Sequence, residues 1–253
     1  MTENHSHSFI GTYRHGAVLE LRLQRPEKKN ALNQAMYRSL ADGFRSADQH
    51  HEVAAVVLRG SEHCFTAGND LADFASGALD ADSPVLDFMR ALSSFSKPLI
   101  VAVEGMAVGI GTTLLLHADL VAASADAQFS LPFSRLGLCP EFASSLLLPR
   151  LCGHVRAFEY LVLGEAFDAQ QAYALGLINV VTDNPLDWAL QRAQRLAAMP
   201  REAVRNGKAL CKAPLRAPAA AAWQNELDIF AQALKGPEFA QAVAAFFNKS
   251  SKT

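Results

Sequence analysis

The sequence predicts an α/β fold, because runs typical of buried strands alternate with stretches at helical spacing. Residues 53–59 (VAAVVLR) and 99–103 (LIVAV) are nearly continuous apolar runs, as in strands covered on both faces. Each run is followed by a loop rich in glycine and other small residues, and then by a helical pattern. The pattern ends near residue 182, after which helices predominate.

Composition favours an ordinary globular protein. Half of the 253 residues are apolar, which suffices for one large core or for a domain with an appendage. The formal charge is −2, from 23 basic and 25 acidic residues, and no long basic run suggests a nucleic acid or a membrane surface as partner. The four cysteines form no CxxC pair, so we expect reduced thiols, a cytoplasmic location and no metal site. Neither a secretion signal nor a membrane-spanning stretch is recognisable.

The first unit of the chain is a strand, a basic loop and a helix. Residues 17–23 alternate apolar and polar side chains, as a half-buried strand does, and the loop 25–30 follows. Asn33 is suited to be the N-cap of a helix that ends near residue 50. Three apolar residues at helical spacing give this helix its buried face: Met36, Leu40 and Phe44.

The rest of the core repeats this scheme. The strand 53–59 leads into the small-residue loop 64–71, then into a polar segment that we interpret as a lid or mobile loop, and the strand 99–103 leads into the glycine turn 105–113. The other elements expected up to the loop 132–140 are helices at 84–95 and 111–117 and strands at 119–123 and 128–131.

The C-terminal part is predicted to be helical. We expect two helices within 153–174, a strand at 177–182, and helices at 185–199, 201–211, 219–234 and 237–248, with a break at Pro214 and Pro218. We divide the chain into a core at 1–199, which carries the site, and a helical oligomerisation region at 200–253. The apolar faces of that region need a partner, either the core or another subunit.

Two loops offer backbone donors for an oxyanion. Gly109-Ile110-Gly111 precedes a helix, whose first N–H groups have no intrahelical acceptor. A dinucleotide fingerprint would need a third glycine where Leu114 stands, so no cofactor is expected; tight packing of helix on strand explains these glycines equally well. The loop Ala67-Gly68-Asn69-Asp70 can also aim an N–H into a cleft, and two such groups would stabilise an enolate.

Glu141 is the candidate base. It follows Pro140, which fixes a rigid turn, and its neighbours Leu138 and Phe142 are apolar. Burial there would raise the pKa of the carboxyl group and suit it to proton transfer. The alternative, which the local sequence by itself favours, is a solvent-facing glutamate at the start of a helix 142–151.

Four segments resemble the crotonase (enoyl-CoA hydratase/isomerase) superfamily in their order and spacing: RPEKKNAL (25–32), FTAGNDL (65–71), VGIG (108–111) and LGLCPE (136–141). The resemblance covers nearly the whole chain, including the ending AAFFNK (244–249). It implies a spiral of ββα turns with a C-terminal helical region that packs in a homotrimer, often in a dimer of trimers. It also implies an acyl-CoA thioester as substrate, no separate cofactor, and a place in fatty acid metabolism, in β-oxidation.

The resemblance assigns roles to individual residues. The thioester oxygen would lie between the backbone N–H groups of Asn69 and Ile110, where Ile110 replaces the usual glycine and its side chain must point away. The other residues expected at the substrate are Lys28, Lys29, Asn30, Ala67, Gly68, Asp70, Leu71, Gly109, Phe133, Phe246 and Lys249. The basic residues among them would lie near the nucleotide part of coenzyme A, or else form a solvated turn and a fraying terminus. Asp70 is expected to hold its own loop, and His63 and His117 to be packing or surface residues.

The carboxylates indicate the reaction. Hydratases of the superfamily use two glutamates to activate water, and this sequence has Thr113 and Phe133 in their places. One branch of the 3-enoyl-CoA to 2-enoyl-CoA isomerases has a single base in a G-x-x-P-E segment, which matches Gly137 to Glu141. The resemblance therefore implies that Glu141 moves a proton from C2 to C4 of a 3-enoyl thioester. The alternatives are another reaction of the superfamily, such as hydration, and a non-catalytic acyl-CoA-binding protein.

Overall fold

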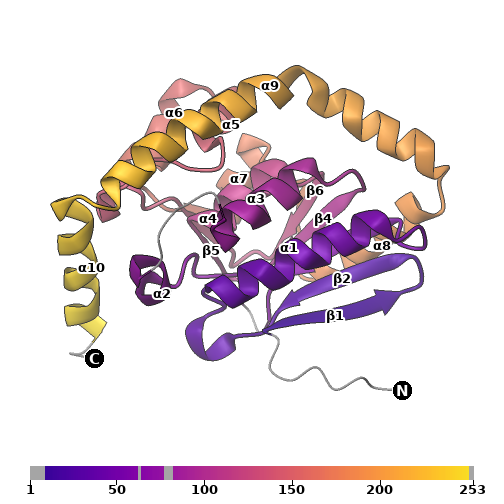
Figure 1. Cartoon of the computed structure of the whole chain (residues 1–253). Coiled ribbons are helices and arrows are strands. Elements are labelled where there is room, and N and C mark those ends of the chain that lie inside the picture. The colour runs from indigo at the N-terminus through magenta and orange to yellow at the C-terminus, as the bar shows by residue number, and fades with distance from the viewer. Residues whose placement is uncertain (1–8, 62–63, 77–81, 251–253) are drawn as a thin grey trace.

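A computed structural model describes residues 9–61, 64–76 and 82–250, and it shows two β-sheets covered by helices (Figure 1). The larger sheet has the strand order β1-β2-β3-β4-β6-β9, and the smaller has the order β5-β7-β8. The larger sheet consists of β1 (Ile10–His15), β2 (Val18–Leu23), β3 (Ala55–Arg59), β4 (Leu99–Val103), β6 (Leu120–Ala123) and β9 (Val180–Val181). The smaller consists of β5 (Met106–Val108), β7 (Gln128–Ser130) and β8 (Phe167–Asp168). The predicted α/β class is confirmed.

The chain follows a spiral path between the two sheets. It passes from β4 in the larger sheet to β5 in the smaller one, and then from β6 to β7. The pairs β3–β4, β4–β6 and β5–β7 are parallel, so each turn of the spiral adds its strands beside those of the turn before.

The helices are α1 (Gln34–Gln49), α2 (Leu71–Ser76), α3 (Pro84–Ser94), α4 (Ile110–Thr113), α5 (Ser144–Cys152), α6 (His154–Phe158), α7 (Ala169–Leu175), α8 (Pro185–Ala197), α9 (Arg201–Ala233) and α10 (Pro237–Ser250).

The central strands of the larger sheet are buried on both faces. In β3, Val56 and Leu58 belong to the main core, which includes residues of α1 and α3. Ala55 and Val57 point to the other face, into a second cluster that includes Ala189 of α8. Because both faces are covered, β3 has no polar position before Arg59, as its apolar sequence predicts.

The helix α1 begins as its sequence predicts. The Asn33 side chain accepts a hydrogen bond from the Met36 backbone N–H at 2.9 Å, which satisfies one donor of the first turn. Met36, Leu40 and Phe44 are all buried on one face of the helix. The predicted N-cap and the buried face are therefore confirmed.

Two predictions about helices are wrong. The helix predicted to start at residue 142 begins at Ser144, because Phe142 and Ala143 have left-handed backbones with φ of 59° and 60°. The break predicted at Pro214 and Pro218 is absent, since both prolines lie inside the continuous helix α9. They are four residues apart on one exposed face, and α9 arches over the core (Figure 1) as a helix bent by proline does.

The C-terminal helices pack in part on the chain's own core. Phe230 of α9 and Phe239 of α10 are each 4% exposed and belong to the main cluster. A Cβ on Gly137 would lie 2.8 Å from the Cβ of Glu238, so α10 closely approaches the loop that precedes Glu141. The core thus supplies part of the partner that these apolar faces require. None of the helices within residues 9–61, 64–76 and 82–250 has the length and apolar character needed to cross a membrane.

Candidate active site

The loop 64–70 lies against strand β5. The Thr66 N–H donates to the Met106 carbonyl at 2.9 Å, and the Val108 N–H donates to the Thr66 carbonyl at 3.1 Å. Gly68 has a φ of +86°, and a Cβ there would lie 2.7 Å from the Val108 carbonyl oxygen. Only glycine combines this backbone conformation with such a close approach. The two small-residue loops singled out in the sequence therefore lie side by side.

The backbone N–H of Asn69 points away from its neighbouring segment. Leu32 donates its N–H to the Gly68 carbonyl at 2.8 Å and accepts from the Asp70 N–H at 2.9 Å. Backbone groups alternate in direction along an extended segment, so the N–H of Asn69, between these two, faces the opposite side. Among the residues that the structure describes, this N–H meets no acceptor.

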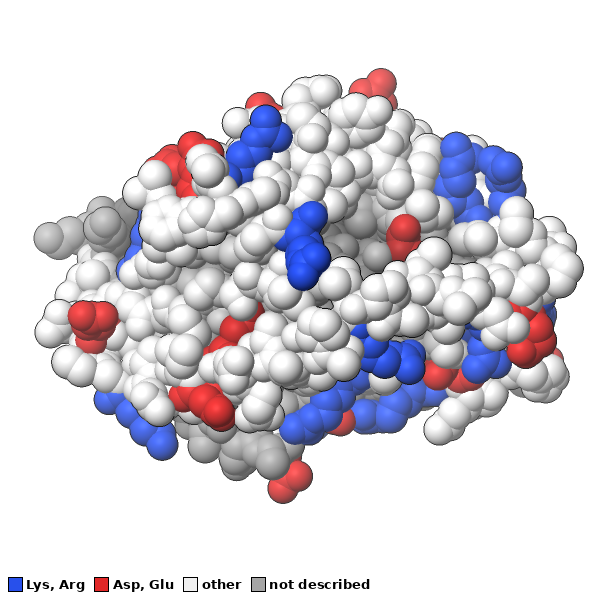
Figure 2. All heavy atoms as spheres, turned by 90° about the horizontal axis from the view of Figure 1, so that it is seen from above, with Lys and Arg blue, Asp and Glu red and all other residues white. Residues whose placement is uncertain are grey.

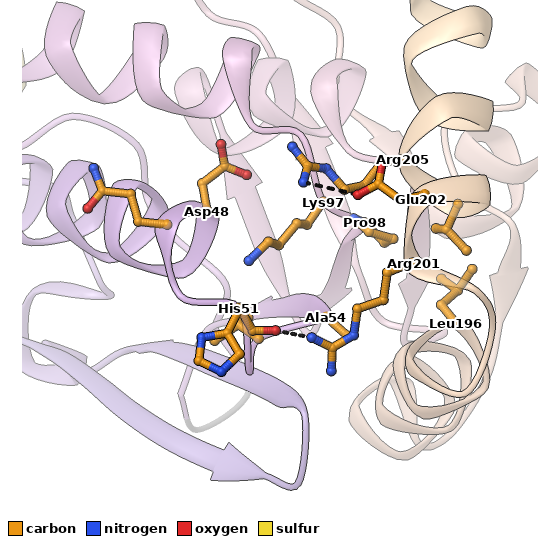
Figure 3. A pocket seen from close by; sticks show the side chains of 12 residues that line it. Asp48, His51, Ala54, Lys97, Pro98, Leu196, Arg201, Glu202 and Arg205 are labelled. Atoms are coloured by element: carbon orange, nitrogen blue, oxygen red, sulfur yellow. Dashed lines mark hydrogen bonds and ion pairs between the residues drawn. The ribbon is translucent and has the colours of Figure 1, made fainter.

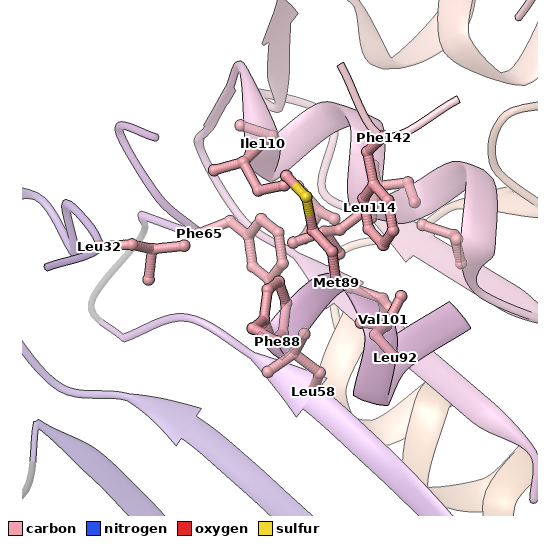
Figure 4. Packing of buried hydrophobic residues seen from close by; sticks show 14 of the residues in the cluster. Leu32, Leu58, Phe65, Phe88, Met89, Leu92, Val101, Ile110, Leu114 and Phe142 are labelled. Carbon is pink, nitrogen blue, oxygen red and sulfur yellow. The ribbon is translucent and has the colours of Figure 1, made fainter. Parts of the chain in front are cut away.

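Ile110 supplies the second donor at the start of α4. The first N–H groups of a helix have no acceptor within it, and the N–H of Ile110 meets none elsewhere in the described ranges. The Ile110 side chain is 1% exposed and packs into the main hydrophobic cluster, near Met89 and Leu114 (Figure 4). The side chain that replaces the usual glycine is thus accommodated by the core.

Glu141 is buried, with 6% of its surface exposed. Its Oε1 accepts a hydrogen bond from Thr113 Oγ1 at 2.5 Å. Burial disfavours the charged carboxylate and raises the pKa of Glu141 to about 8, while the Thr113 hydrogen bond lowers it and the nearby charge of Glu226 raises it. The solvent-facing alternative is therefore excluded, and a pKa of about 8 suits the group to proton transfer near neutral pH.

The helix α4 connects the base to one of the two donors. Ile110 is its first residue and Thr113 its last, so four residues carry both the backbone donor and the hydroxyl that binds Glu141. In the sequence, Thr113 was noted only because it stands where hydratases of the superfamily have a glutamate. Nothing in the sequence links it to Glu141, which follows 28 residues later.

A strained turn follows Glu141. Left-handed conformations cost about 1–2 kcal/mol at residues other than glycine, and Phe142 and Ala143 adopt them in succession. The carboxylate of Glu226, from α9, accepts hydrogen bonds from the backbone N–H of Ala143 and from that of Ser145. The turn is thus held by a residue of the C-terminal region.

His117 supports the same turn. Its ring stacks on that of Phe142, with 3.8 Å between the ring centroids, and its Nε2–H donates to the Phe142 carbonyl at 2.8 Å. Burial, the largest effect, lowers the pKa of His117 to about 4, so the imidazole is neutral at pH 7. The packing role expected for this histidine agrees with these contacts.

Tyr37 of α1 is a further polar residue at the site. Its hydroxyl donates to the Oδ1 atom of Asn69, and its ring is buried. Burial raises the pKa of Tyr37 well above its usual value, and the charges of Glu141 and Asp73 add to this effect. The sequence analysis did not single out Tyr37, because a tyrosine beside Met36 carries no sign of a contact with Asn69, 32 residues later.

The basic loop contains two exposed lysines and one buried asparagine. Lys28 and Lys29 are exposed and available to a ligand, but Asn30 is fully buried. The Asn30 side chain accepts from the Arg25 N–H at 2.8 Å and donates to the Cys64 carbonyl at 2.8 Å. Asn30 therefore joins two loops, and its side chain does not reach the surface where coenzyme A would bind.

Asp70 holds its loop, as expected. Its Oδ2 pairs with the Arg25 guanidinium at 2.7 Å, and its Oδ1 accepts from the Ala72 N–H at 3.2 Å. The pKa of Asp70 is lowered: burial raises it, but the hydrogen bond and charge of Arg25 outweigh that effect. Leu71 begins α2 directly after it. With its carboxylate occupied, Asp70 contributes to the site through the position of the loop.

The remaining predicted contacts are backbone and apolar groups. Gly109 has a φ of +55° and donates its N–H to the Ser130 carbonyl at 2.8 Å. Ala67 is half-buried in the loop beside β5, and its N–H donates to the Lys29 carbonyl. Phe133 is 6% exposed and places an apolar ring where hydratases have their second glutamate.

Some predictions fall outside the described part of the chain. This applies to His63, to residues 77–81 of the segment interpreted as a lid or mobile loop, and to the side chains of Phe246 and Lys249. The roles expected for Phe246 and Lys249 at the coenzyme A moiety remain predictions.

Two cavities lie beneath α9. The larger, of about 660 Å³, borders the turn that follows Glu141, and its walls include His117, Phe142, Ala143 and Trp223. The smaller, of about 220 Å³, lies where the start of α9 meets the end of α1 (Figure 3). There the Arg201 guanidinium donates a hydrogen bond to the His51 carbonyl, and this bond holds the start of α9 against the end of α1. No group of three or more His, Cys, Asp or Glu residues in the described ranges is arranged to hold a metal ion.

Comparisons with known proteins agree with this geometry. A family model described as enoyl-CoA hydratase/isomerase matches residues 13–253. The chain is 36% identical over 230 residues to a probable enoyl-CoA hydratase of Mycobacterium tuberculosis (strain ATCC 25618 / H37Rv), with 87% of this chain and 90% of the relative covered. It is 32% identical over 247 residues to enoyl-CoA delta isomerase 2 of Homo sapiens, with 93% of this chain and 62% of that protein covered. The solved structure of Pseudomonas aeruginosa OdaA matches with a TM-score of 0.92 at 44% identity, covering 95% of this chain and 99% of that one.

Proposed function

This chain belongs to the enoyl-CoA hydratase/isomerase family, and from that premise we propose that it shifts the double bond of 3-enoyl-CoA thioesters to the 2-trans position. The observation that carries the proposal is the environment of Glu141. Its carboxylate is buried with a raised pKa and bonded to Thr113, and α4 links it to the Ile110 donor. A second buried carboxylate, Glu226, has both oxygens bonded to backbone N–H groups, so it is not available as a base.

The reaction needs one base and two donors. The Glu141 carboxylate takes a proton from C2 of the 3-enoyl thioester, and the electron pair of that C–H bond delocalises onto the thioester oxygen. The resulting dienolate is stabilised by the backbone N–H groups of Asn69 and Ile110. The Glu141 carboxyl then returns its proton to C4, and the double bond lies between C2 and C3. The base is regenerated, and neither water nor a redox partner is consumed.

Hydration is the second candidate, because the Mycobacterium tuberculosis relative is named a probable hydratase at 36% identity. Adding water requires a group that positions and activates it. The Thr113 hydroxyl donates a hydrogen bond to Glu141, and Phe133 offers an apolar ring. Among the described residues, the one other carboxylate that acts on Glu141 is that of Glu226, which is held by backbone donors, and this favours proton return over water addition.

The test is the conversion of 3-hexenoyl-CoA by the wild-type protein and by Glu141→Gln. We expect the wild type to form the conjugated 2-enoyl thioester, and the variant to be slower by a factor of about 100 or more, since it lacks the base. Binding of the thioester, measured by calorimetry, should be retained by the variant. Glu52→Gln, which neutralises an exposed glutamate, is the control and should keep full activity.

Three results would contradict the proposal. A wild-type protein that binds the thioester without converting it would be a non-catalytic acyl-CoA-binding protein. Formation of 3-hydroxyacyl-CoA from 2-enoyl-CoA as the main activity would make the protein a hydratase. Full isomerase activity in Glu141→Gln would exclude Glu141 as the base.

A further inference from the structure

The residue that holds the turn after Glu141 lies in the C-terminal helix α9. The carboxylate of Glu226 is 5% exposed, and each of its oxygens accepts a backbone hydrogen bond: Oε2 from Ala143 at 2.6 Å and Oε1 from Ser145 at 2.9 Å. We propose that Glu226 is a positioning residue for proton transfer, which fixes Glu141 against Thr113 by clamping this turn. The inference rests on the proposed role of Glu141 as the base.

The turn cannot hold its conformation through its own side chains. Ala143 occupies the N-cap position of α5, where serine, threonine, asparagine or aspartate would normally accept a hydrogen bond from the first turn. Alanine has no acceptor, and both Phe142 and Ala143 are in strained left-handed conformations. The Glu226 carboxylate, which belongs to α9, provides the hydrogen-bond acceptors that a capping side chain would otherwise provide at the start of α5. Its negative charge also suits the start of a helix.

The contacts of Glu226 are linked to Glu141 by one backbone hydrogen bond. The Ser144 N–H donates to the backbone carbonyl of Glu141 at 3.1 Å, between the two residues that Glu226 binds. The Glu141 side chain then meets Thr113 Oγ1 on the other side. If the turn opened, the Glu141 carboxylate would lose its fixed distance from Thr113 and from α4. A shift of about 1 Å in a catalytic group can lower the rate about 100-fold.

Glu226 also acts on Glu141 through its charge. Four groups face Glu141: Thr113 of α4, Tyr37 of α1, Cys139 of the same loop, and Glu226 of α9. The pKa values of Tyr37 and Cys139 are raised, so these two groups stay neutral near pH 7 and Glu226 is the group whose negative charge can act on Glu141. Burial raises the pKa of Glu226, while the two backbone donors at its oxygens stabilise the ionised form. Removing this charge would make Glu141 easier to ionise. The expected change in pH dependence is therefore a shift of the acid limb of kcat/KM towards lower pH.

Three variants separate the clamp from a purely structural contact. In Glu226→Gln the side chain keeps its shape, but its NH2 group faces one of the two backbone donors and the charge is lost. We expect kcat to fall about 100-fold, KM to change less than kcat, and the acid limb to move to lower pH. Glu226→Asp keeps the charge, but its side chain is one methylene shorter. We expect kcat to fall, while the acid limb of kcat/KM shifts less than in Glu226→Gln. Glu202→Gln removes an exposed carboxylate of the same helix and should change nothing.

A measurement that does not need turnover keeps this inference separate from the proposed function. The carboxyl carbon of Glu141 can be followed by NMR in protein labelled with ¹³C-glutamate, and its signal is assigned by its loss in Glu141→Gln. We expect this carboxyl to titrate at lower pH in Glu226→Gln than in wild type. An unchanged titration and an unchanged kcat, with a lowered Tm alone, would overturn the positioning role. A wild type without isomerase activity would instead refute the proposed function.

Discussion

Two buried glutamates, Glu141 and Glu226, show how the surroundings of a carboxylate decide its use. The oxygens of Glu226 are saturated by two backbone donors, whereas Glu141 has a single hydroxyl donor, on Oε1. Burial raises the pKa of both side chains. Of these two glutamates, only Glu141 has a carboxylate oxygen, Oε2, that accepts no hydrogen bond from the described residues. This free oxygen makes Glu141 the candidate base.

The Thr113 hydroxyl should set the working pH of the base. Its hydrogen bond to Glu141 stabilises the ionised form, so Thr113→Val should raise the pKa of Glu141 further above 8. The acid limb of kcat/KM then moves to higher pH, and activity at pH 7 falls. Thr113→Ser retains the hydroxyl and should keep the limb within a few tenths of a pH unit of wild type. A limb at the wild-type position in Thr113→Val would show that the hydroxyl does not act on the base.

The raised pKa of Glu141 also predicts a dependence of stability on pH. The carboxyl titrates near 4.5 in the unfolded chain and near 8 in the folded one, so the folded state binds more protons between these values. The free energy of unfolding therefore decreases as pH rises from about 4.5 to about 8. Glu141→Gln cannot ionise, so it should be more stable than wild type above pH 8, by a few kcal/mol, and similar at pH 4. Urea unfolding at both pH values measures this difference, and an equal difference at both would contradict it.

At the scale of residues, the sequence revealed local partners and missed distant ones. The Asn33 cap binds a group three positions away. Glu141 became the candidate base only through the other segments of the resemblance, since its own segment favoured a solvent-facing glutamate. Thr113 lies 28 residues from Glu141, and Glu226 lies 81 residues from Ser145. Polar residues at such separations meet only through the tertiary fold, and no periodicity in one sequence indicates which of them do.

At the scale of elements, the fit between the loop 64–70 and β5 depends on a missing side chain. Gly68→Ala would place a Cβ 2.7 Å from the Val108 carbonyl, in a conformation with φ of +86°. We expect a loss of more than about 1 kcal/mol in stability, together with a larger loss of activity, because the Asn69 donor moves. Thermal unfolding and kcat/KM measure the two effects.

The control for this change is another glycine. Gly207 lies inside α9, and a Cβ there would meet no atom within 4 Å. Gly207→Ala should therefore stabilise the protein by about 1 kcal/mol, through helix propensity, and leave activity unchanged. Should Gly68→Ala behave like this control, the close packing of the two loops would be disproved.

Among the elements, the strands covered on both faces were the easiest to predict. The strands β3 and β4 are continuous apolar runs, and their bounds nearly coincide with the prediction. The edge strand β1 was missed, because its side chains from Thr12 to Arg14 are exposed and carry no apolar pattern. Helix α9 was divided in two because proline usually ends a helix. Here α9 continues through both prolines, which are exposed, so their rings do not disturb the core.

At the scale of the whole molecule, apolar side chains remain exposed on α6, α9 and the segment after α6. They include Val155 at 81%, Phe158 at 53%, Leu163 at 58%, Leu210 at 73% and Ile229 at 56% exposure. The face over α9 shows charged side chains only at scattered places (Figure 2). Such surfaces typically serve contacts between proteins.

The resemblance to the superfamily implies a homotrimer or a dimer of trimers, and we expect such an assembly to cover some of these side chains. Light scattering should give three or six times the 27.3 kDa mass of one chain. Val155→Lys places a charge on the apolar surface and should lower the measured mass, while Thr12→Lys, on the exposed edge strand β1, should not. A wild-type protein that remains a monomer at micromolar concentration would contradict this prediction.

The hydrogen bonds from Ala143 and Ser145 to Glu226 also affect the order in which the protein matures during synthesis. The ribosome makes the strands, both donor loops and Glu141 well before α9, and these parts can pack as they emerge. The turn after Glu141 gains its acceptor only once residue 226 has left the exit tunnel. The nascent chain would thus fix the turn after Glu141 late in synthesis, and truncation just before residue 226 would leave that turn without its acceptor and would also remove Phe230 and Phe239 from the core.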